Sequence, residues 1–190
     1  MSDTNATNDT RGDAAQQSWI KRHPIWTAVL AILTIFILIV VVLLLLPFDV
    51  EDNSIANPAT THDEAVTRIA AVQEAEKNSG EINPVCISNV MTHGETTDKV
   101  IVFYHGFTSC PEQFRELGET FFDQGYNVYI PRLPYHGHSD QMSEALLKTS
   151  AEELASFATE SIDIARGLGD EIIVGGLSGG GTLSAWIAQE

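Results

Sequence analysis

Basic side chains are scarce in this sequence. Its 190 residues include 10 Lys and Arg against 26 Asp and Glu, which gives a formal net charge of −16 at pH 7. Nucleic acids and anionic lipid headgroups attract proteins through positive charge. The composition therefore argues against nucleic acid as a partner and against binding to an anionic lipid surface.

Cysteine is also rare, with Cys86 and Cys110 alone in the chain and no CxxC spacing. Structural zinc sites need four Cys or His ligands at short spacings, so we predict no metal site and no bound cofactor. The two cysteines either form a disulfide or remain as two unpaired thiols. An exported location would permit the disulfide.

Charge is absent from residues 25–46, which read "IWTAVLAILTIFILIVVVLLLL". As a helix this run would extend roughly 33 Å at about 1.5 Å per residue, enough to cross a bilayer. The run predicts one transmembrane helix. A cleaved signal peptide is the alternative, because Ser54 to Ala56 has the small residues of a cleavage site.

The charges that flank this run are asymmetric. Lys21 and Arg22 precede it, whereas Asp49, Glu51 and Asp52 follow it. The positive-inside rule then places the N-terminus in the cytoplasm and everything after the span outside, the two cysteines included. We divide the chain into a disordered cytoplasmic tail (1–24), a transmembrane helix (25–46), a juxtamembrane linker and helix (47–81) and a partial catalytic domain (82–190).

Apolar runs alternate with amphipathic segments after the linker. Capping boxes at Thr61–Glu64 and Ser150–Glu153 predict the starts of two helices. The expected strands are 99–106, 127–133 and 171–176, and the expected helices between them are 109–125 and 150–168. This alternation predicts an α/β fold with a parallel sheet core and helices on both faces.

The segment "GLSGG" at 176–180 matches the GxSxG pattern. It follows an apolar strand and precedes a helical stretch, which is the context that a nucleophile elbow requires. A phosphate-binding loop is the alternative, but no Lys follows Lys148 and the glycines do not form GxGxxG. The pattern therefore indicates that Ser178 is a nucleophile.

The segment "HGFTSCPEQF" (105–114) follows the first of these strands. With the GLSGG elbow about 70 residues later, the chain from 82 to 190 resembles the α/β-hydrolase superfamily, particularly its monoacylglycerol-lipase-like and carboxylesterase-like members. The resemblance implies that Ser178 is the nucleophile and that the backbone N–H groups of Phe107 and Gly179 bind the oxyanion. It also implies that Gly106 permits the sharp turn and that His105 is structural.

A third motif, "PRLPYHGHSD" (131–140), resembles the loop after the next strand of the same superfamily. His136, His138 and Asp140 alternate in a way that metal ligands also do. No later Cys or His completes such a site, so we interpret the loop as lining the substrate pocket.

A serine nucleophile needs a histidine base and an orienting carboxylate, which in this superfamily follow the serine in the chain. All six histidines of this sequence precede Ser178. We therefore expect the 190 residues to be the first part of a longer hydrolase, truncated after the elbow and inactive alone. The alternative is a non-catalytic, membrane-anchored relic of the fold.

These observations predict a membrane-anchored serine hydrolase that acts on ester bonds, like a lipase or carboxylesterase. Its expected partner is a small-molecule or lipid-like acyl substrate. Peptidase and acyltransferase activities stay open as alternatives, because the fold hosts many chemistries.

Overall fold

The computed structural model describes residues 23–46 and 55–189. Most of the predicted tail at 1–24 and the first part of the predicted linker lie outside the described residues. The chain separates into two compact units, Met1–Asp49 and Val50–Glu190, which are described separately.

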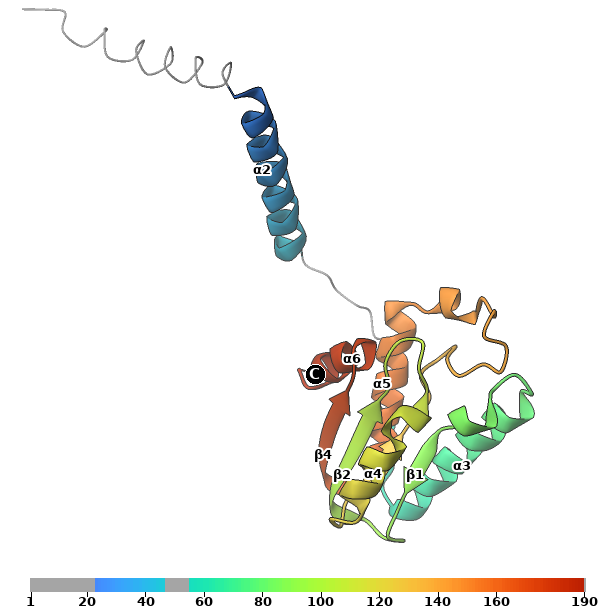
Figure 1. Ribbon diagram of the computed structural model, residues 1–190. Helices are drawn as coiled ribbons and strands as arrows, with labels where there is room; N and C mark the ends of the chain where they lie inside the picture. Colours follow the sequence, from blue (N-terminus) through green and yellow to red (C-terminus); the bar gives the residue numbers. More distant parts are fainter. Residues whose placement is uncertain (1–22, 47–54, 190) are drawn as a thin grey trace, which may run out of the picture. The chain divides into compact units, whose positions relative to one another are not determined.

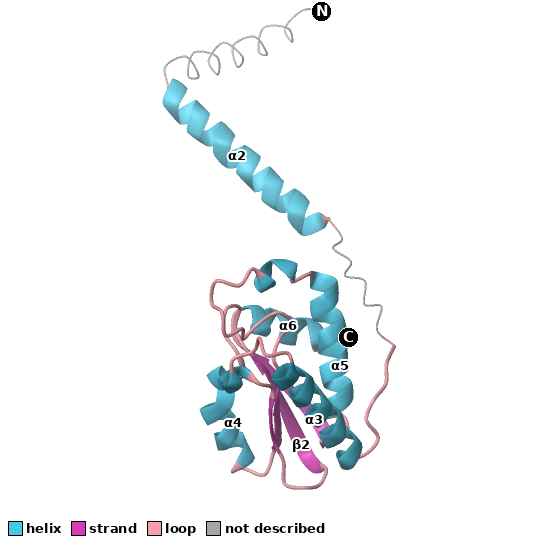
Figure 2. Cartoon of the chain, turned by 90° about the vertical axis from the view of Figure 1, so that its right-hand side faces the viewer, coloured by secondary structure: helices cyan, strands magenta, loops and turns pink. Residues whose placement is uncertain are grey.

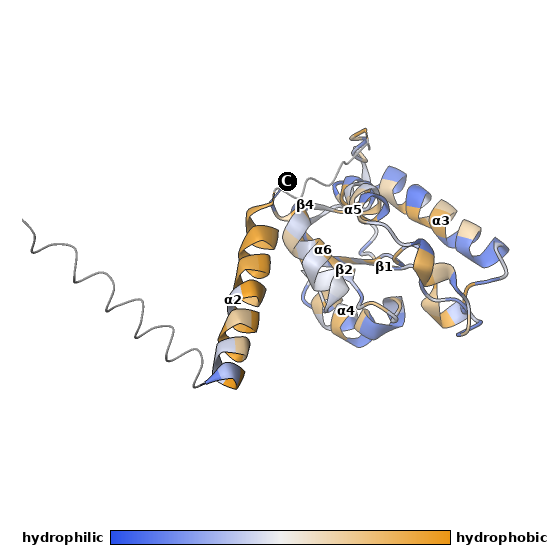
Figure 3. Cartoon of the chain, turned by 90° about the horizontal axis from the view of Figure 1, so that it is seen from above, coloured by the Kyte–Doolittle hydropathy of each residue, from blue (hydrophilic) through white to orange (hydrophobic). Residues whose placement is uncertain are grey.

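Helix α2 (Pro24–Leu45) is the described part of the first unit. It is hydrophobic along almost its whole length, as Figure 3 shows, and none of its residues is buried. Thr34 satisfies its hydroxyl within the helix by donating to the Leu30 carbonyl at 2.8 Å. With a mean hydropathy of 3.5 over 18 residues, α2 meets the criteria of a membrane-spanning helix, which a signal sequence near the N-terminus also meets.

The second unit contains a four-stranded sheet of order β1-β3-β2-β4 (Figure 1). Its strands are β1 (Asn89–Met91), β2 (Thr97–Tyr104), β3 (Asn127–Ile130) and β4 (Gly169–Gly176). β2 pairs in parallel with β3 and β4, as the alternating pattern predicts. β1 differs, because it pairs antiparallel with β3. Only residues 92–96 connect β1 to β2, whereas parallel strands need a crossover of about a dozen residues. β1 therefore runs opposite to β2, and also opposite to β3, which is parallel to β2.

Helices cover both faces of this sheet. Figure 2 shows α4 (Arg115–Phe122) on one side of the strands and α3 (His62–Asn78) and α5 (Ala151–Ala165) on the other. Helix α6 (Gly179–Ile187) joins α3 and α5, since its Leu183 belongs to the same core cluster. The α/β architecture with helices on both faces is therefore confirmed.

Strand β2 supplies both halves of the core. Its alternating side chains enter opposite faces of the sheet. Val100, Val102 and Tyr104 pack with α3, α5 and α6, whereas Ile101 and Phe103 pack with the aromatic side chains of the α4 side. This double burial explains why β2 reads as a continuous apolar run.

The predicted helix starts are confirmed at α3 and α5, where Thr61 and Ser150 each accept the backbone N–H of the glutamate three positions later. The predicted helix at 109–125 differs in form. It begins as a 3₁₀ turn, Pro111–Phe114, and becomes α-helical as α4. Leu117, which the pattern assigns to the apolar face, is 44% exposed.

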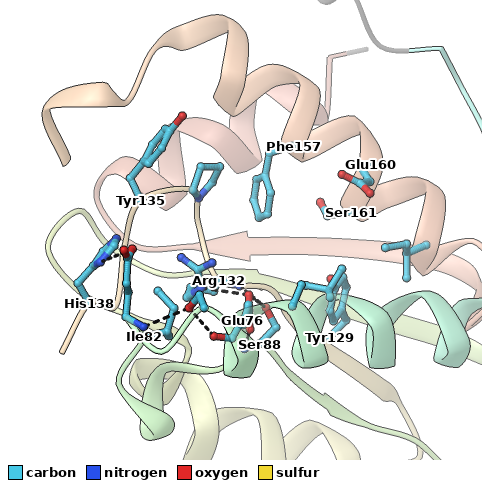
Figure 4. A pocket seen from close by; sticks show the side chains of 16 residues that line it. Glu76, Ile82, Ser88, Tyr129, Arg132, Tyr135, His138, Phe157, Glu160 and Ser161 are labelled. Carbon is cyan, nitrogen blue, oxygen red and sulfur yellow. Dashed lines mark hydrogen bonds and ion pairs between the residues drawn. The ribbon is translucent and has the colours of Figure 1, made fainter. Parts of the chain in front are cut away.

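Helix α3 is tied to the sheet by a buried ion pair. Arg132 Nε donates to the Glu76 carboxylate at 3.1 Å, and the two side chains are 15% and 5% exposed. The same carboxylate accepts the backbone N–H and the hydroxyl of Ser88, each at 2.7 Å. Figure 4 shows this cluster at one side of a pocket of about 530 Å³ that is lined by α3 and α5.

We predict that Glu76→Gln lowers the free energy of unfolding by about 3 kcal/mol or more, because it leaves the buried Arg132 charge unpaired. The matched control is Glu74→Gln on the exposed side of the same helix, which should change it by less than about 0.5 kcal/mol. Denaturant titration of the detergent-solubilised chain measures both. Equal effects of the two substitutions would contradict a stabilising role for the pair.

Candidate active site

Ser178 lies between β4 and α6 in a backbone conformation that residues other than glycine rarely adopt. Its φ is 53° and its ψ is −120°. As the N-cap of α6 it accepts the N–H of Thr182 at 3.0 Å through its carbonyl, while its side chain makes no capping hydrogen bond. Residues held in strained conformations of this kind concentrate at active sites.

Two glycines make the turn sterically possible. A Cβ atom on Gly180 would lie 2.1 Å from the Tyr104 carbonyl oxygen, and one on Gly176 would lie 2.3 Å from the Gly180 carbonyl oxygen. Backbone atoms cannot move aside as the end of a flexible side chain can. The GxSxG pattern is therefore required by the close packing of α6 against the ends of β2 and β4.

The turn after β2, residues 105–110, lies beside the elbow. A Cβ atom on Gly179 would lie 3.6 Å from the Phe107 Cβ and 3.7 Å from the Phe107 backbone nitrogen. The structure thus brings together the residues expected to supply the two oxyanion donors. Phe107 and Leu177 are 51% and 53% exposed, so an apolar rim flanks Ser178.

The resemblance predicts the sharp turn at Gly106, but the structure places it elsewhere. Gly106 has no positive φ, and a Cβ there would make ordinary contacts at 3.5 Å. The left-handed residue is Thr108, with φ of 67°. The sequence does not signal this position, because β-branched residues are among the least suited to that conformation.

His105 is fully buried, and it links the ends of β2 and β3. Its Nε2 accepts the Leu133 N–H at 3.0 Å, so its Nδ1 carries the proton and donates to the Gly106 carbonyl at 3.0 Å. Burial lowers the pKa of His105 to about 4, which keeps the ring neutral at pH 7. These contacts agree with the structural role expected of His105.

These bonds orient the Phe107 N–H. The Gly106 carbonyl accepts from His105 Nδ1 and from the Ser109 N–H, both at 3.0 Å. In a planar trans peptide the N–H points opposite to the carbonyl oxygen. Two donors on the Gly106 oxygen therefore fix the direction of the Phe107 N–H.

Gln113 also holds this turn in place, although no sequence pattern identifies it. Its Oε1 accepts the Gly106 N–H at 2.7 Å. The seven-residue separation crosses from the turn into the following 3₁₀ segment. No periodic or motif signal identifies such a contact, which depends on the turn's tertiary geometry.

The loop at 131–140 holds all three residues considered as metal ligands, His136, His138 and Asp140. His136 is buried, its Nδ1 donates to the Pro134 carbonyl at 2.7 Å, and its ring meets that of Phe107 edge-on with centroids 5.1 Å apart. His138 Nδ1 lies 3.8 Å from the Glu81 carboxylate. Within residues 23–46 and 55–189, no group of three His, Cys, Asp or Glu is arranged to hold a metal ion.

The disulfide is present. Cys86 and Cys110 are bonded, with their Cα atoms 5.2 Å apart, within the range that disulfides require. The pairing joins the 3₁₀ turn before β1 (Pro84–Cys86) to the end of the turn that follows β2.

We predict that Gly180→Ala lowers the free energy of unfolding by at least about 3 kcal/mol, at the upper end of overpacking costs. Gly181→Ala is the matched control, because a Cβ there comes no closer than 3.3 Å to the nearest atom. We expect it to cost less than about 1 kcal/mol. Thermal or denaturant unfolding checks both, and a well-tolerated Gly180→Ala would contradict the described packing.

A second prediction concerns pH. Because the pKa of His105 falls from 6.5 in the unfolded chain to about 4 in the folded protein, only the unfolded state binds this proton between those values. Stability should be full above about pH 6.5 and fall by on the order of 3 kcal/mol as the pH decreases toward 4. Burial lowers the pKa of His136 as well, which adds in the same direction.

Denaturant unfolding between pH 7.5 and 4 measures this dependence. His105→Gln should be less stable than the parent at pH 7 and should lose less stability on acidification. Gln124→Ala removes an exposed side chain that does not titrate and should keep the parent's slope. An unchanged slope in His105→Gln would show that other groups cause the acid sensitivity.

Comparison with known proteins places the second unit in a family. A model described as the alpha/beta hydrolase fold matches residues 99–190. A thermostable monoacylglycerol lipase from Bacillus sp. (strain H-257) is 33% identical over 90 residues, which cover 47% of this chain and 34% of that enzyme. The chain thus spans about a third of the length of this curated relative.

A solved structure from work on the metagenome-derived lipolytic enzymes LipS and LipT is also similar. It shares 27% identity and a TM-score of 0.47, over 57% of this chain and 42% of its own. The family match includes the turn after β2 and the elbow after β4. The part of this chain from residue 99 to residue 190 therefore belongs to the α/β-hydrolase superfamily.

Proposed function

We propose that this chain belongs to a serine hydrolase of ester bonds, in which Ser178 is the nucleophile. The observation that carries the proposal is the geometry of the elbow. Ser178 is held at φ 53° on the first turn of α6, and Gly179 lies against the backbone nitrogen of Phe107. A strained, exposed serine beside two backbone N–H groups is the arrangement that acyl transfer uses.

In the proposed reaction the Ser178 hydroxyl attacks the ester carbonyl and gives its proton to a general base. The carbonyl oxygen becomes an oxyanion that accepts hydrogen bonds from the N–H groups of Phe107 and Gly179. The N-terminal end of α6 adds its positive dipole end. Collapse of the intermediate expels the alcohol, which takes the proton from the base, and water then releases the acid from the acyl-enzyme.

His105 does not serve as this base. Its Nε2 is occupied by the Leu133 N–H, and its Nδ1 donates to the Gly106 carbonyl. Its low pKa follows from burial and not from catalytic tuning. In the chain order of the superfamily, the base and its carboxylate partner follow the nucleophile. We propose the same order for the complete enzyme.

We further propose an apolar acyl ester as the substrate class. Phe107 and Leu177 flank Ser178 with more than half of each side chain exposed, which suits an aliphatic acyl group. The similarity to an enzyme named monoacylglycerol lipase supports a lipid-like ester. The acidic composition makes an uncharged ester a better fit than an anionic one.

For the location, we propose that residues 25–46 anchor the protein in a membrane and that residues 82–190 form the hydrolase part outside the cytoplasm. The support is the uniformly apolar α2, the basic pair Lys21 and Arg22 before it, and a disulfide that needs an oxidising compartment.

The proposal predicts that a fluorophosphonate probe labels Ser178 in membranes that contain the native protein. Ser178→Ala should abolish labelling and lower ester hydrolysis by at least about 10³-fold. Ser79→Ala, which removes an exposed serine at the C-terminal end of α3, is the matched control and should keep both activities. Mass spectrometry of the labelled peptide identifies the site. A native protein that resists the probe at Ser178 would support a non-catalytic binding role instead.

A further inference from the structure

The turn that presents Phe107 is strained at the next residue. Thr108 is β-branched and has φ of 67°, a conformation that such residues adopt only when their surroundings impose it. Thr108 is itself exposed, and so is half of the Phe107 side chain. Packing on the core therefore does not hold residues 107 and 108, and the constraint must come from the ends of the turn.

The first end is held by hydrogen bonds. Gly106 donates its N–H to Gln113, and its carbonyl accepts from His105 and Ser109. The second end is held by a covalent bond, because Cys110 is linked to Cys86. The disulfide-bonded Cys110 thus lies two residues after the strained Thr108.

Cys86 is itself held in place by the 131–140 loop. The Asn83 N–H donates to the Gly137 carbonyl at 2.8 Å, and Asn83 caps the short helical turn that contains Cys86. A Cβ atom on Gly137 would lie 2.7 Å from the Cys86 Cβ, so the loop backbone lies directly against the disulfide.

His136, the residue before Gly137, connects this loop to the turn after β2. The His136 ring meets the Phe107 ring at a centroid distance of 5.1 Å and the His105 ring at 5.2 Å. The contacts therefore run from Phe107 to His136, through Gly137 to the disulfide, and back through Cys110 to the turn. Opening the disulfide would remove the covalent bond that joins the turn to the segment around Cys86.

We propose that the Cys86–Cys110 disulfide is a positioning element of the oxyanion hole, which holds Thr108 in its strained conformation and thereby aims the Phe107 N–H. This inference rests on the proposed function of the turn. Its consequence is that reduction impairs the site while the sheet stays folded.

The effect should be local because of where the bond lies. Cys86 ends the 3₁₀ turn Pro84–Cys86, and Cys110 is the N-cap of the 3₁₀ turn Pro111–Phe114. The bond therefore joins no strand of the sheet. β2 keeps its ladders with β3 and β4 whether or not the bond exists. A cleft of about 560 Å³ is lined by both cysteines, which gives a small thiol reagent access to them.

The first experiment compares hydrogen exchange in the oxidised and reduced full chain in detergent. Dithiothreitol transfers two electrons and two protons to the cysteines and leaves as its cyclic disulfide. We expect the amides of Gly106 and Ser109 to exchange at least tenfold faster after reduction. The amides of Val102 and Tyr129, in the paired strands, should change less than twofold. Cys86→Ser/Cys110→Ser should reproduce the reduced pattern without reductant.

A second experiment displaces the disulfide with both cysteines intact. Gly137→Ala introduces a Cβ that collides with Cys86, whereas Gly94→Ala has open space around its Cβ. Both glycines have positive φ, 73° and 85°, so the pair separates the collision from backbone strain. Gly137→Ala should accelerate exchange at Gly106 and Ser109, and Gly94→Ala should not.

In the native enzyme, a mispositioned oxyanion donor weakens binding of the transition state but not of the ester. Gly137→Ala should therefore lower kcat about tenfold with KM within about twofold of the parent. A change in KM alone would indicate a substrate-binding role and would overturn the proposal.

Two exchange results would also overturn it. Unchanged exchange at Gly106 and Ser109 after reduction would show that the hydrogen bonds suffice to hold the turn. Equal acceleration in the turn and in the strands would show that the disulfide stabilises the whole fold. Because exchange does not depend on turnover, a failure of Ser178 to react with the fluorophosphonate would contradict the proposed function and leave these results interpretable.

Discussion

The close approach of α6 to the end of β2 is the constraint on which the site depends. The Tyr104 carbonyl accepts the Leu177 N–H at 3.2 Å and occupies the space that a Gly180 side chain would need. The register of the parallel pair places Tyr104 opposite Gly176. The chain leaves β2 at the next residue, so one strand pairing positions both the Ser178 turn and the Phe107 turn.

The electrostatics of the site come from backbone groups. His105 and His136 are buried, burial lowers the pKa of both, and each donates through Nδ1 to a backbone carbonyl. Neutral rings add no net charge beside Ser178. In the proposed oxyanion hole, the positive potential would come from N–H groups and the α6 terminus, which keep it at any pH at which the fold persists. A chain with a net charge of −16 can thus stabilise an oxyanion at this turn without a lysine or arginine side chain.

The parts of this structure that the sequence predicted are those set by short-range geometry. Continuous apolar runs placed β2 and β4, an apolar stripe placed α5, and the capping boxes at Thr61 and Ser150 located the starts of α3 and α5. The elbow was predictable because the steric demand on Gly176 and Gly180 is local and leaves a distinct pattern. The resemblance at 105–107 named Phe107, and the structure places it beside Gly179.

What the sequence did not predict depends on partners that are distant along the chain or on backbone angles without a residue signature. Glu76 and Arg132 are 56 positions apart, and either would read alone as a surface charge. The direction of β1 follows from the length of its connection, and the left-handed Thr108 follows from closure of the turn. The cysteines left two alternatives until their Cα atoms were placed 5.2 Å apart.

The two-sided burial of β2 has a consequence for how mutations combine. Phe103 and Tyr104 are adjacent in sequence, yet their side chains belong to separate clusters on opposite faces of the sheet. Energetic coupling between substitutions requires shared partners, and these two clusters share the sheet backbone but no side chain. Substitutions at these neighbouring positions should therefore change different side-chain contacts, so that the α4 side could be repacked separately from the side that carries α6 and the Ser178 turn.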